Sequence, residues 1–297
     1  MIKASYEVLQ PASGHSFLVR KFGKTAFDAP YHFHEEFELT CIVHGRGKRY
    51  VGSHMENFAS GDLVFLGQNL PHCWKLDPER DETEASAIVI QFSANFLGDE
   101  FFNKPELHAV RKMFQKSGSG ISFNGATRDI INKSMQVLTE EKSNFKMLMY
   151  LLDMLQRLAV SAEYTFLDQQ RCVAERSRAE QERINPVFAY LVENFRGQVS
   201  LDAASGIANM TPNAFCKYFK KITRKTFMET VIEYRLNYAT QQLVQTDKPI
   251  SDISFESGFG DVSHFYKMFK NKMHQSPLNY RKNFMREFND TEDKIWA

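Results

Sequence analysis

The residues of this chain best suited to chemistry lie in the segment 31–39, YHFHEEFEL. If this segment is a strand, its side chains alternate between two faces. One face then carries His32, His34, Glu36 and Glu38. A further histidine, His72, ends the stretch 61–72 and would come from a facing strand. Imidazole nitrogens and a carboxylate are ligands that first-row divalent metals accept, so the sequence predicts a polar site made of His32, His34, Glu38 and His72.

The residues leave three uses of this cluster open. It holds a divalent metal such as Mn, Fe, Ni or Zn, it hydrogen-bonds a small ligand without a metal, or its polar groups only satisfy one another in the core. The second and third of these uses require no cofactor. Cys41 is excluded as a ligand, because it has the opposite even-odd phase to Glu38 and would point away from the cluster.

A second set of functional residues forms an internal repeat near the C-terminal end. The segments 214–221 (AFCKYFKK) and 264–271 (HFYKMFKN) match at an offset of 50. In each copy two phenylalanines lie four residues apart on one helical face and the lysines lie on another. We expect the aromatic face to pack inward and the lysines to stay in water.

Each repeat follows a short predicted helix, 201–208 in the first copy and 250–257 in the second. Between the helices stands a residue that tolerates left-handed geometry, Asn209 or Gly258. Ser205 and Ser254 are small enough for two helices to approach closely. This order of helix, tight turn and helix is the helix-turn-helix arrangement, whose second helix enters a DNA major groove.

The distribution of charge supports the same interpretation. The chain of 297 residues has 37 Lys and Arg against 36 Asp and Glu, a net charge of only +1, which by itself gives no indication of a nucleic-acid partner. Residues 184–288, however, contain 14 basic and 9 acidic residues, a net charge of +5, and the remainder carries −4. The positive charge is therefore concentrated where DNA phosphates would bind.

The N-terminal residues have the pattern of an antiparallel sandwich or small barrel. Glycine, asparagine and proline separate five β-rich runs, 16–22, 37–43, 48–52, 61–66 and 87–92. The runs 37–43 and 48–52 flank His44-Gly45-Arg46-Gly47, which predicts a hairpin between them. The length of the chain indicates two domains.

Between these regions, apolar residues from Ile130 to Leu138 and from Phe145 to Leu158 recur with helical spacing. Two roles are open for these helices: they dimerise the protein, or they cover the barrel as part of its core. The charged run 175–183 (ERSRAEQER) is the predicted linker between the halves. No apolar stretch reaches the roughly 18 residues of a membrane span, and the first residues do not resemble a secretory signal, so the expected location is the cytoplasm. The four cysteines are far apart and are expected to be reduced and mostly buried.

Residues 185–281 resemble the DNA-binding domain of AraC/XylS-type transcription regulators. The most specific segment is ISDISFESGFGDVSHFYKMFK at 250–270, followed by Ser-Pro at 276–277 and Tyr-Arg at 280–281. The resemblance implies two helix-turn-helix units joined by a long helix over about 227–245. The sequence departs from the family at Arg224 and His274, where glycine is usual, so these residues must accept a positive φ at a cost of about 1 kcal/mol or rearrange the helix end.

The same resemblance assigns roles within the repeats. Bases would be read by Asn213, Ala214, Cys216, Lys217, Val262, Ser263, Tyr266 and Lys267. Phosphates would be contacted by Lys220, Lys221, Lys270 and Arg281. An amide suits adenine, a lysine suits guanine, and phosphate contacts position the domain without reading sequence. A solvated helix face is the competing interpretation for each lysine.

The front half resembles the cupin barrel. His32-x-His34-x3-Glu38-x6-Gly45 matches the first cupin motif, and the stretch to His72 matches the second loosely, with Gly67 where proline is common. In regulator-type cupins this barrel serves as an effector pocket. Tyr50, Phe65 and Trp74 are candidates for its wall, and a polar floor within an aromatic wall suits a sugar or a small aromatic acid. The predicted effector pocket comprises His32, His34, Glu38, Tyr50, His72 and Trp74.

These observations predict an α+β multi-domain protein with an N-terminal cupin-like β-barrel, following helices and a C-terminal all-α double helix-turn-helix domain. The expected division is a sensing and dimerising domain at 1–173, a linker at 174–184, a DNA-binding domain at 185–288 and an acidic tail at 289–297. The predicted function is an effector-responsive transcription regulator, not an enzyme, that binds double-stranded DNA, forms a homodimer and meets RNA polymerase as the family does. The alternative is a metal-dependent cupin isomerase or oxygenase fused to a DNA-binding module.

Overall fold

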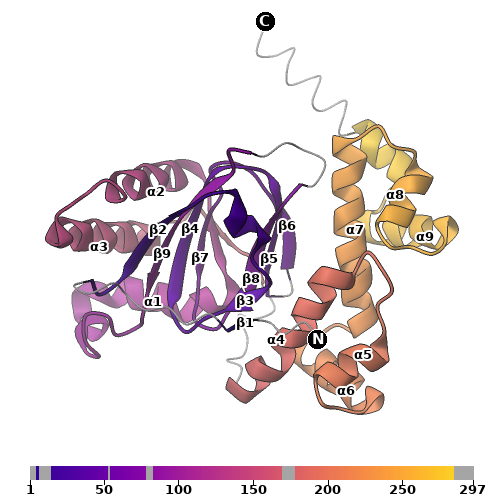
Figure 1. The fold of residues 1–297 in the computed structure, drawn as a ribbon, viewed down its shortest axis with the longest axis horizontal. Helices are drawn as coiled ribbons and strands as arrows, with labels where there is room; N and C mark the ends of the chain where they lie inside the picture. The colour runs from indigo at the N-terminus through magenta and orange to yellow at the C-terminus, as the bar shows by residue number, and fades with distance from the viewer. Residues whose placement is uncertain (1–4, 7–14, 53, 78–82, 169–177, 284–297) are drawn as a thin grey trace, which may run out of the picture. The chain divides into compact units, whose positions relative to one another are not determined.

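The computed structural model describes residues 5–6, 15–52, 54–77, 83–168 and 178–283 (Figure 1). The chain divides into two compact units, residues 1–189 and 190–297. The division falls within helix α4 (Arg178–Asn194), so the part of the predicted linker from residue 178 onward is helical. Residues 174–177 and the predicted tail lie outside the described residues.

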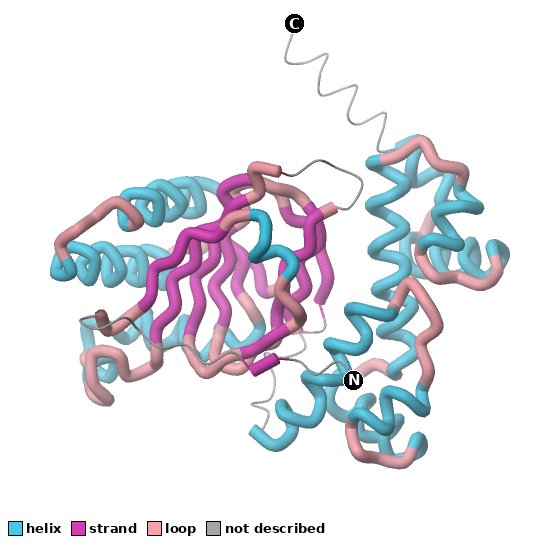
Figure 2. Tube along the Cα trace, in the orientation of Figure 1, coloured by secondary structure: helices cyan, strands magenta, loops and turns pink. Residues whose placement is uncertain are grey.

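The first unit contains two β-sheets, drawn in magenta in Figure 2. One sheet has five strands in the order β1-β3-β8-β5-β6, and the other has six in the order β11-β10-β7-β4-β9-β2. All described pairs are antiparallel except β1 with β3. The strands are β1 (Ser5–Tyr6), β2 (Leu18–Phe22), β3 (His32–Phe33), β4 (Phe37–His44), β5 (Gly47–Val51), β6 (His54–Phe58), β7 (Leu63–Leu66), β8 (His72–Leu76), β9 (Ser86–Phe92), β10 (Ile121–Phe123) and β11 (Tyr164–Phe166). The predicted antiparallel β-region is confirmed.

The predicted hairpin between residues 37–43 and 48–52 is wrong. Strand β4 pairs with β7 and β9, whereas β5 pairs with β6 and β8 in the other sheet. Gly45, with φ 124°, turns the chain from one sheet into the other. Glycines that permit a positive φ serve a hairpin and a crossing between sheets equally well, so the local sequence does not distinguish the two.

The segment 31–39 is likewise not one continuous strand. Strand β3 ends at Phe33 in the five-stranded sheet, and β4 begins at Phe37 in the six-stranded sheet. The three residues between them carry the chain from one sheet to the other. His32 and Glu38 therefore meet across the interior instead of sharing one face of one strand.

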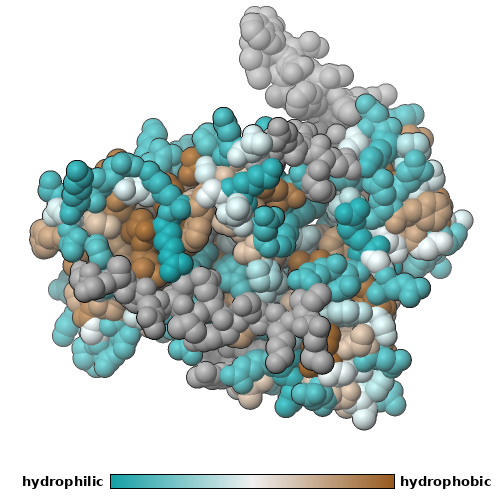
Figure 3. Space-filling model, in the orientation of Figure 1, coloured by the Kyte–Doolittle hydropathy of each residue, from teal (hydrophilic) through white to brown (hydrophobic). Residues whose placement is uncertain are grey.

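Three helices cover the six-stranded sheet (Figure 1). They are α1 (His108–Lys116), α2 (Gly125–Leu138) and α3 (Asn144–Val160). Ile131, Met135 and Leu155 are fully buried against Phe65 and Ile90 of the sheet in one apolar cluster. This confirms that the helices cover the barrel. Their outer faces also carry exposed apolar side chains, including Ile130, Val137, Phe145 and Met149, and Figure 3 shows apolar atoms among polar ones over these helices.

The second unit is helical. Besides the end of α4 it contains α5 (Leu201–Ile207), α6 (Pro212–Thr223), α7 (Phe227–Gln245), α8 (Ile250–Glu256) and α9 (Val262–Met273). Helix α7 is the predicted long connecting helix, and it begins with a capping box formed by Thr226 and Glu229. The predicted C-terminal helical domain is confirmed.

The turns within this unit use left-handed backbone geometry as predicted. Asn209 and Gly258 have φ of 53° and 90°. Arg224 and His274 have φ of 61° and 57°, so both non-glycine residues accept the positive φ instead of rearranging the helix end. The departures from the family pattern therefore leave the helix ends in place.

Three cysteines lie among the described residues. Cys41 and Cys73 are buried free thiols, as expected, but Cys216 is exposed on α6, and Cys172 falls outside the described residues. In the described part of the chain, every helix is too short or too polar to cross a membrane.

Candidate functional sites

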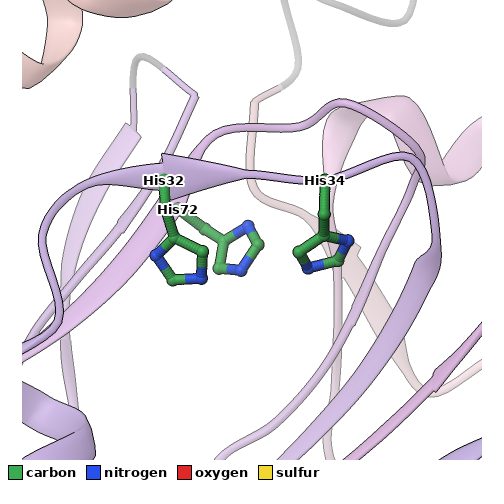
Figure 4. A group of neighbouring side chains, drawn as sticks. All are labelled: His32, His34 and His72. Carbon is green, nitrogen blue, oxygen red and sulfur yellow. The ribbon is translucent and has the colours of Figure 1, made fainter. Parts of the chain in front are cut away.

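A cavity of about 270 Å³ lies in the first unit and is lined by residues of both sheets. At its polar end the side chains of His32, His34 and His72 gather, with one nitrogen of each within 4.8 Å of the others. Figure 4 shows the three rings projecting to the same side, His32 from β3, His34 from the segment after it and His72 from β8. The sequence prediction that these residues converge is supported by this geometry.

Backbone carbonyls orient the histidine rings. The Nδ1 atoms of His32, His34 and His72 lie 2.9, 3.2 and 2.7 Å from the carbonyl oxygens of residues 30, 36 and 70. Because a carbonyl oxygen can only accept, each Nδ1 is the donor in these contacts, which leaves the Nε2 atoms of His32 and His72 for the cluster, whereas Nε2 of His34 is hydrogen-bonded to Glu38 Oε2. Nε2 of His72 is buried without a hydrogen-bond partner among the described residues.

Glu38 lies at the centre of the polar end. Its Oε1 accepts from Thr40 Oγ1 at 2.6 Å, and its Oε2 accepts from Gln91 Nε2 at 2.7 Å and lies 2.9 Å from His34 Nε2. Burial alone would raise the pKa of Glu38, but His72 and the hydrogen bond of His34 hold it well below its usual range. The buried carboxylate therefore stays ionised at neutral pH.

His32, which lies near Glu38, is neutral. Burial, with a contribution from His72, lowers the pKa of His32 to about 4. A neutral imidazole keeps the Nε2 lone pair that a metal or a ligand donor needs. The imidazoles of His32, His34 and His72 and the carboxylate of Glu38, with backbone carbonyls orienting the rings, are a donor set that fits a first-row divalent ion once His34 Nε2 exchanges its hydrogen bond to Glu38 for the ion.

The cavity agrees only in part with the predicted effector pocket. His32, Glu38, His72 and Trp74 line it, whereas His34 contacts Glu38 without lining the cavity. Tyr50 does not line it. Trp74 and His72 are paired with Arg49 and Val51 on β5, so the residue between those two points to the other face of the sheet.

Phe65 is also placed elsewhere, in the cluster between the six-stranded sheet and its helices. Thr40 and Gln91, which lie beside Glu38, and the apolar wall were not predicted from the sequence. The signal for Thr40 was available, because it has the same strand phase as Glu38. Gln91 depends on the pairing of β9 with β4, which is not local. The cavity is lined by Phe22, Ala26, Phe27, Ala29, Pro30, His32, Glu38, Thr40, Ile42, His72, Trp74, Ala87, Val89 and Gln91.

In the second unit, α6 and α9 each present one polar face. Phe215 and Phe219 of α6, and Phe265 and Phe269 of α9, are completely buried. The opposite faces hold the eight predicted base-reading residues, of which Val262 is half-buried and the other seven are exposed, namely Asn213, Ala214, Cys216, Lys217, Ser263, Tyr266 and Lys267. The predicted phosphate contacts Lys220, Lys221 and Lys270 are exposed as well.

Arg281 has a different position from the one expected of a phosphate contact. Its Nε donates to the carbonyl of Leu243 at 3.0 Å and its Nη2 donates to the carbonyl of Lys248 at 2.8 Å. Both carbonyls lie at the C-terminal end of α7 and just after it. The guanidinium thus satisfies carbonyls at and just after a helix end through Nε and Nη2, and its contact with a phosphate stays a prediction.

The arrangement of the second unit is a double helix-turn-helix. Residues 205–283 match the family model described as "Helix-turn-helix domain". The chain is 21% identical over 259 residues to the uncharacterized HTH-type transcriptional regulator YdeC of Bacillus subtilis, covering 85% of this chain and 86% of that protein. It is 22% identical over 249 residues to an uncharacterized HTH-type transcriptional regulator of Staphylococcus aureus, covering 81% of this chain but only 30% of that protein.

Among solved structures, the AraC-type transcriptional regulator from Chromobacterium violaceum is 23% identical, with a TM-score of 0.34, over 36% of this chain and 96% of that chain. With the repeat, the left-handed turns and the family match in view, residues 205–283 form an AraC-type helix-turn-helix domain, and the chain is similar over most of its length to HTH-type transcriptional regulators.

Proposed function

We propose that this protein is a sequence-specific regulator that binds double-stranded DNA through α6 and α9 and responds to a small molecule bound in the N-terminal cavity. The observation that carries the DNA-binding part is the placement of two exposed polar helices at the two ends of α7. Helix α7 has 19 residues. At a rise of about 1.5 Å per residue it is about 28 Å long, close to the ~34 Å between successive major grooves.

The exposed side chains of α6 and α9 suit two different kinds of DNA contact, one with base edges and one with phosphates. Asn213, Lys217 and Lys267 have the donors that suit base edges, and Lys220, Lys221 and Lys270 extend from the last turns of α6 and α9, where they can reach phosphates. The buried phenylalanines fix which face each helix exposes.

A selection of bound DNA sequences followed by footprinting tests this proposal. We expect two short conserved blocks about one helical turn apart, read without a palindrome by a single chain. Binding without sequence preference, or protection of a single block, would contradict the paired use of α6 and α9.

For the N-terminal cavity, the proposal rests on its volume of about 270 Å³ and on the convergence of polar groups at one end. A bound effector would change DNA affinity, and by linkage DNA would change effector affinity by the same factor. Titrating the effector with and without operator DNA measures both sides of this coupling. Equal effector affinities would show that cavity and DNA site are uncoupled.

A divalent metal is a second candidate for the same polar end, because the buried Nε2 of His72 makes no hydrogen bond within the described residues and lies 3.5 Å from Glu38 Oε1. His32, His34, Glu38 and His72 would hold Mn, Fe, Ni or Zn, which would act as a Lewis acid toward a bound ligand. Elemental analysis of the purified protein, with His72→Ala as the control, tests this. Stoichiometric metal with catalytic turnover, and no sequence-specific DNA complex, would favour the enzyme alternative.

We also propose a homodimer through the outer faces of α2 and α3. Ile130, Val137, Phe145 and Met149 are 46%, 50%, 71% and 51% exposed, more apolar surface than two covering helices need. Val137→Glu with Phe145→Glu should give a monomer in sedimentation experiments, while Lys133→Glu on the same helix should not. RNA polymerase as a partner rests on the family resemblance alone.

A further inference from the structure

The cavity of the first unit is graded from polar to apolar along its length. On the six-stranded sheet the paired residues that line it run from Glu38 with Gln91, through Thr40 with Val89, to Ile42 with Ala87. Each step along the paired strands therefore exchanges a polar residue for an apolar one. The facing sheet contributes His72 and then Trp74 in the same direction from the polar end.

The apolar end offers a polyhydroxylated ligand little besides the indole Nε1 of Trp74, which belongs to the same apolar cluster as Phe27, Ile42 and Ala87. Beyond Thr40 and Val89, the cavity is bounded by Ile42 and Ala87 of the six-stranded sheet and by Phe27, which stacks on Phe58 with ring centroids 5.9 Å apart. A sugar carries hydroxyl groups around its whole ring, and those that reach this end would lose their water without gaining a partner. A flat or branched apolar body would instead bury its surface there.

The unpartnered polar groups of the cavity suit a ligand head group that both accepts and donates hydrogen bonds. Gln91 must turn its Nε2 toward Glu38, because an ionised carboxylate can only accept, and its Oε1 is then left as an acceptor. Among the described residues, Oε1 of Gln91 and the indole Nε1 of Trp74 are buried without hydrogen-bond partners. A hydroxyl or an amide can donate to the first and accept from the second.

A carboxylate head suits this end poorly. It has no proton to donate to Gln91 Oε1, and it would lie near the buried carboxylate of Glu38, whose two oxygens already accept from Thr40 and Gln91. Two carboxylates close together in a buried site repel each other. Both ligand classes that the sequence analysis favoured, sugars and aromatic acids, are therefore disfavoured.

Building on the effector pocket proposed above, we infer that the effector is a small uncharged amphiphile, with an aromatic or branched apolar body and a hydroxyl or amide head. The body lies along Ile42, Ala87 and Phe27, and the head lies at Gln91, Trp74 and Glu38. The remaining cavity residues shape the wall and do not choose the class of ligand.

Trp74 provides the readout for a test with defined probes. The chain has two tryptophans, and Trp296→Phe leaves Trp74 as the single one. In this background we would titrate para-ethylphenol, para-ethylanisole, para-ethylbenzoate and D-glucose and follow Trp74 fluorescence. The phenol and the anisole differ only in the hydroxyl proton, so the pair isolates the donor.

We expect saturable binding of para-ethylphenol, at least about tenfold weaker binding of para-ethylanisole, and no saturation by para-ethylbenzoate or D-glucose. Gln91→Leu should remove most of the difference between phenol and anisole. Ala87→Phe should abolish binding by filling the apolar end. Tyr50→Phe, on the other face of the sheet, should change nothing.

Tighter binding of the benzoate or of glucose, or the absence of a saturable signal with the phenol, would overturn the inference. Thermal unfolding of each variant identifies one that fails to fold, and Ala87→Leu is then the milder replacement for Ala87→Phe. DNA binding is measured separately on the same preparations. If DNA binds and the phenol does not, the inference fails alone; if the phenol binds and DNA does not, the regulator proposal fails and the inference stands.

Discussion

Helices α5–α6 and α8–α9 present the same arrangement twice in one chain, so they can be compared position by position. Phe215 and Phe219 correspond to Phe265 and Phe269, and all four are fully buried. Lys217 and Lys220 correspond to Lys267 and Lys270, and all four are exposed. The shared phenylalanines therefore fix which face of α6 and of α9 packs inward, and the shared lysines keep the exposed face positively charged.

The copies differ mainly at exposed positions. Asn213 corresponds to Ser263, Ala214 to His264 and Cys216 to Tyr266, and all six are exposed. The amide, methyl and thiol of one helix are replaced by a hydroxyl, an imidazole and a phenol in the other. These groups differ in size and in hydrogen-bonding capacity, so the two helices should read different base sequences from similar positions.

The two turns differ as well. Asn209 and Gly258 both have a positive φ, but Asn209 already accommodates a Cβ, whereas Gly258 lies against another backbone. A Cβ added there would come 2.7 Å from the carbonyl oxygen of Arg196. The first turn needs only a residue that tolerates left-handed geometry, whereas the second needs the absence of a side chain.

The largest effect that tests this comparison is expected from Gly258→Ala. The new Cβ adds a clash to the strained backbone, and we expect a loss of about 3 kcal/mol in the free energy of unfolding. Asn209→Ala should cost only about 1 kcal/mol, because the site has strain without a clash. Urea denaturation of the full chain measures both, and equal losses would contradict the difference between the turns.

Gly206→Ala is the matched control for that pair. Gly206 lies in α5, and a Cβ there would meet nothing within 4 Å. Alanine favours the helix, so the variant should gain up to about 1 kcal/mol.

The next effect concerns Lys217 and Lys267, the corresponding lysines of the two copies. Each alanine variant should lose about 1–3 kcal/mol of discrimination at one base position, and the two positions should lie in different blocks of the operator. Binding titrations on operators with single base changes locate the positions. Loss at the same position, or a uniform loss on all operators, would contradict independent reading by α6 and α9.

A smaller effect is expected from Lys221→Ala. Lys221 is exposed in the last turn of α6, and the equivalent residue of α9 is Asn271, so only the first copy has this charge. The variant should weaken binding to all DNA by about 1 kcal/mol and lower the slope of log K against log salt by about 0.9. Asn271→Lys should raise that slope by a similar amount. Selective loss at one base would show that Lys221 reads sequence.

The smallest effect is expected at Glu233, which joins the two copies. From α7 it forms ion pairs with Lys225, which follows α6, and with Lys272 of α9, the latter at 2.9 Å. Burial alone would raise the pKa of Glu233, but the hydrogen bonds and charges of the two lysines lower it. Because the site is partly exposed, Glu233→Gln should cost less than about 1 kcal/mol at neutral pH.

The pH dependence of the stability difference between the wild type and Glu233→Gln tests the direction of the pKa shift of Glu233. A lowered pKa in the folded state contributes stability above the ordinary value of 4.5, and this contribution is lost as pH falls through the lowered pKa. The stability difference between the wild type and Glu233→Gln should therefore shrink in acid. A constant difference from neutral to acidic pH would show that the variant acts through packing.

The helical unit could be predicted from the sequence more fully than the β-unit. The two helix-turn-helix pairs and the left-handed residues followed from patterns within a few residues of each other, and the bounds of α7 followed from the family resemblance. The exposed and buried faces of α6 and α9 followed from their period. The contacts of Arg281 at the end of α7 could not be predicted, because they join residues 38 and 33 positions apart.

In the β-unit, local patterns identified strands but not their partners. The sequence placed 37–43 beside 48–52, yet β4 and β5 belong to different sheets. A change of partner also changes which residues face the interior, which is why Tyr50 was included in the pocket and Gln91 was missed.

The sequence by itself determined the repeated helix pairs, the concentration of positive charge at the C-terminal end and the identity of the histidine and glutamate cluster. These depend on helical period, on composition and on residue type, all of which are local. Only the tertiary structure decided which strands pair, that Thr40 and Gln91 join Glu38, and that the cavity runs from polar to apolar. Strand pairing joins residues far apart in the chain, so the chemistry of the cavity exists only once both sheets have formed.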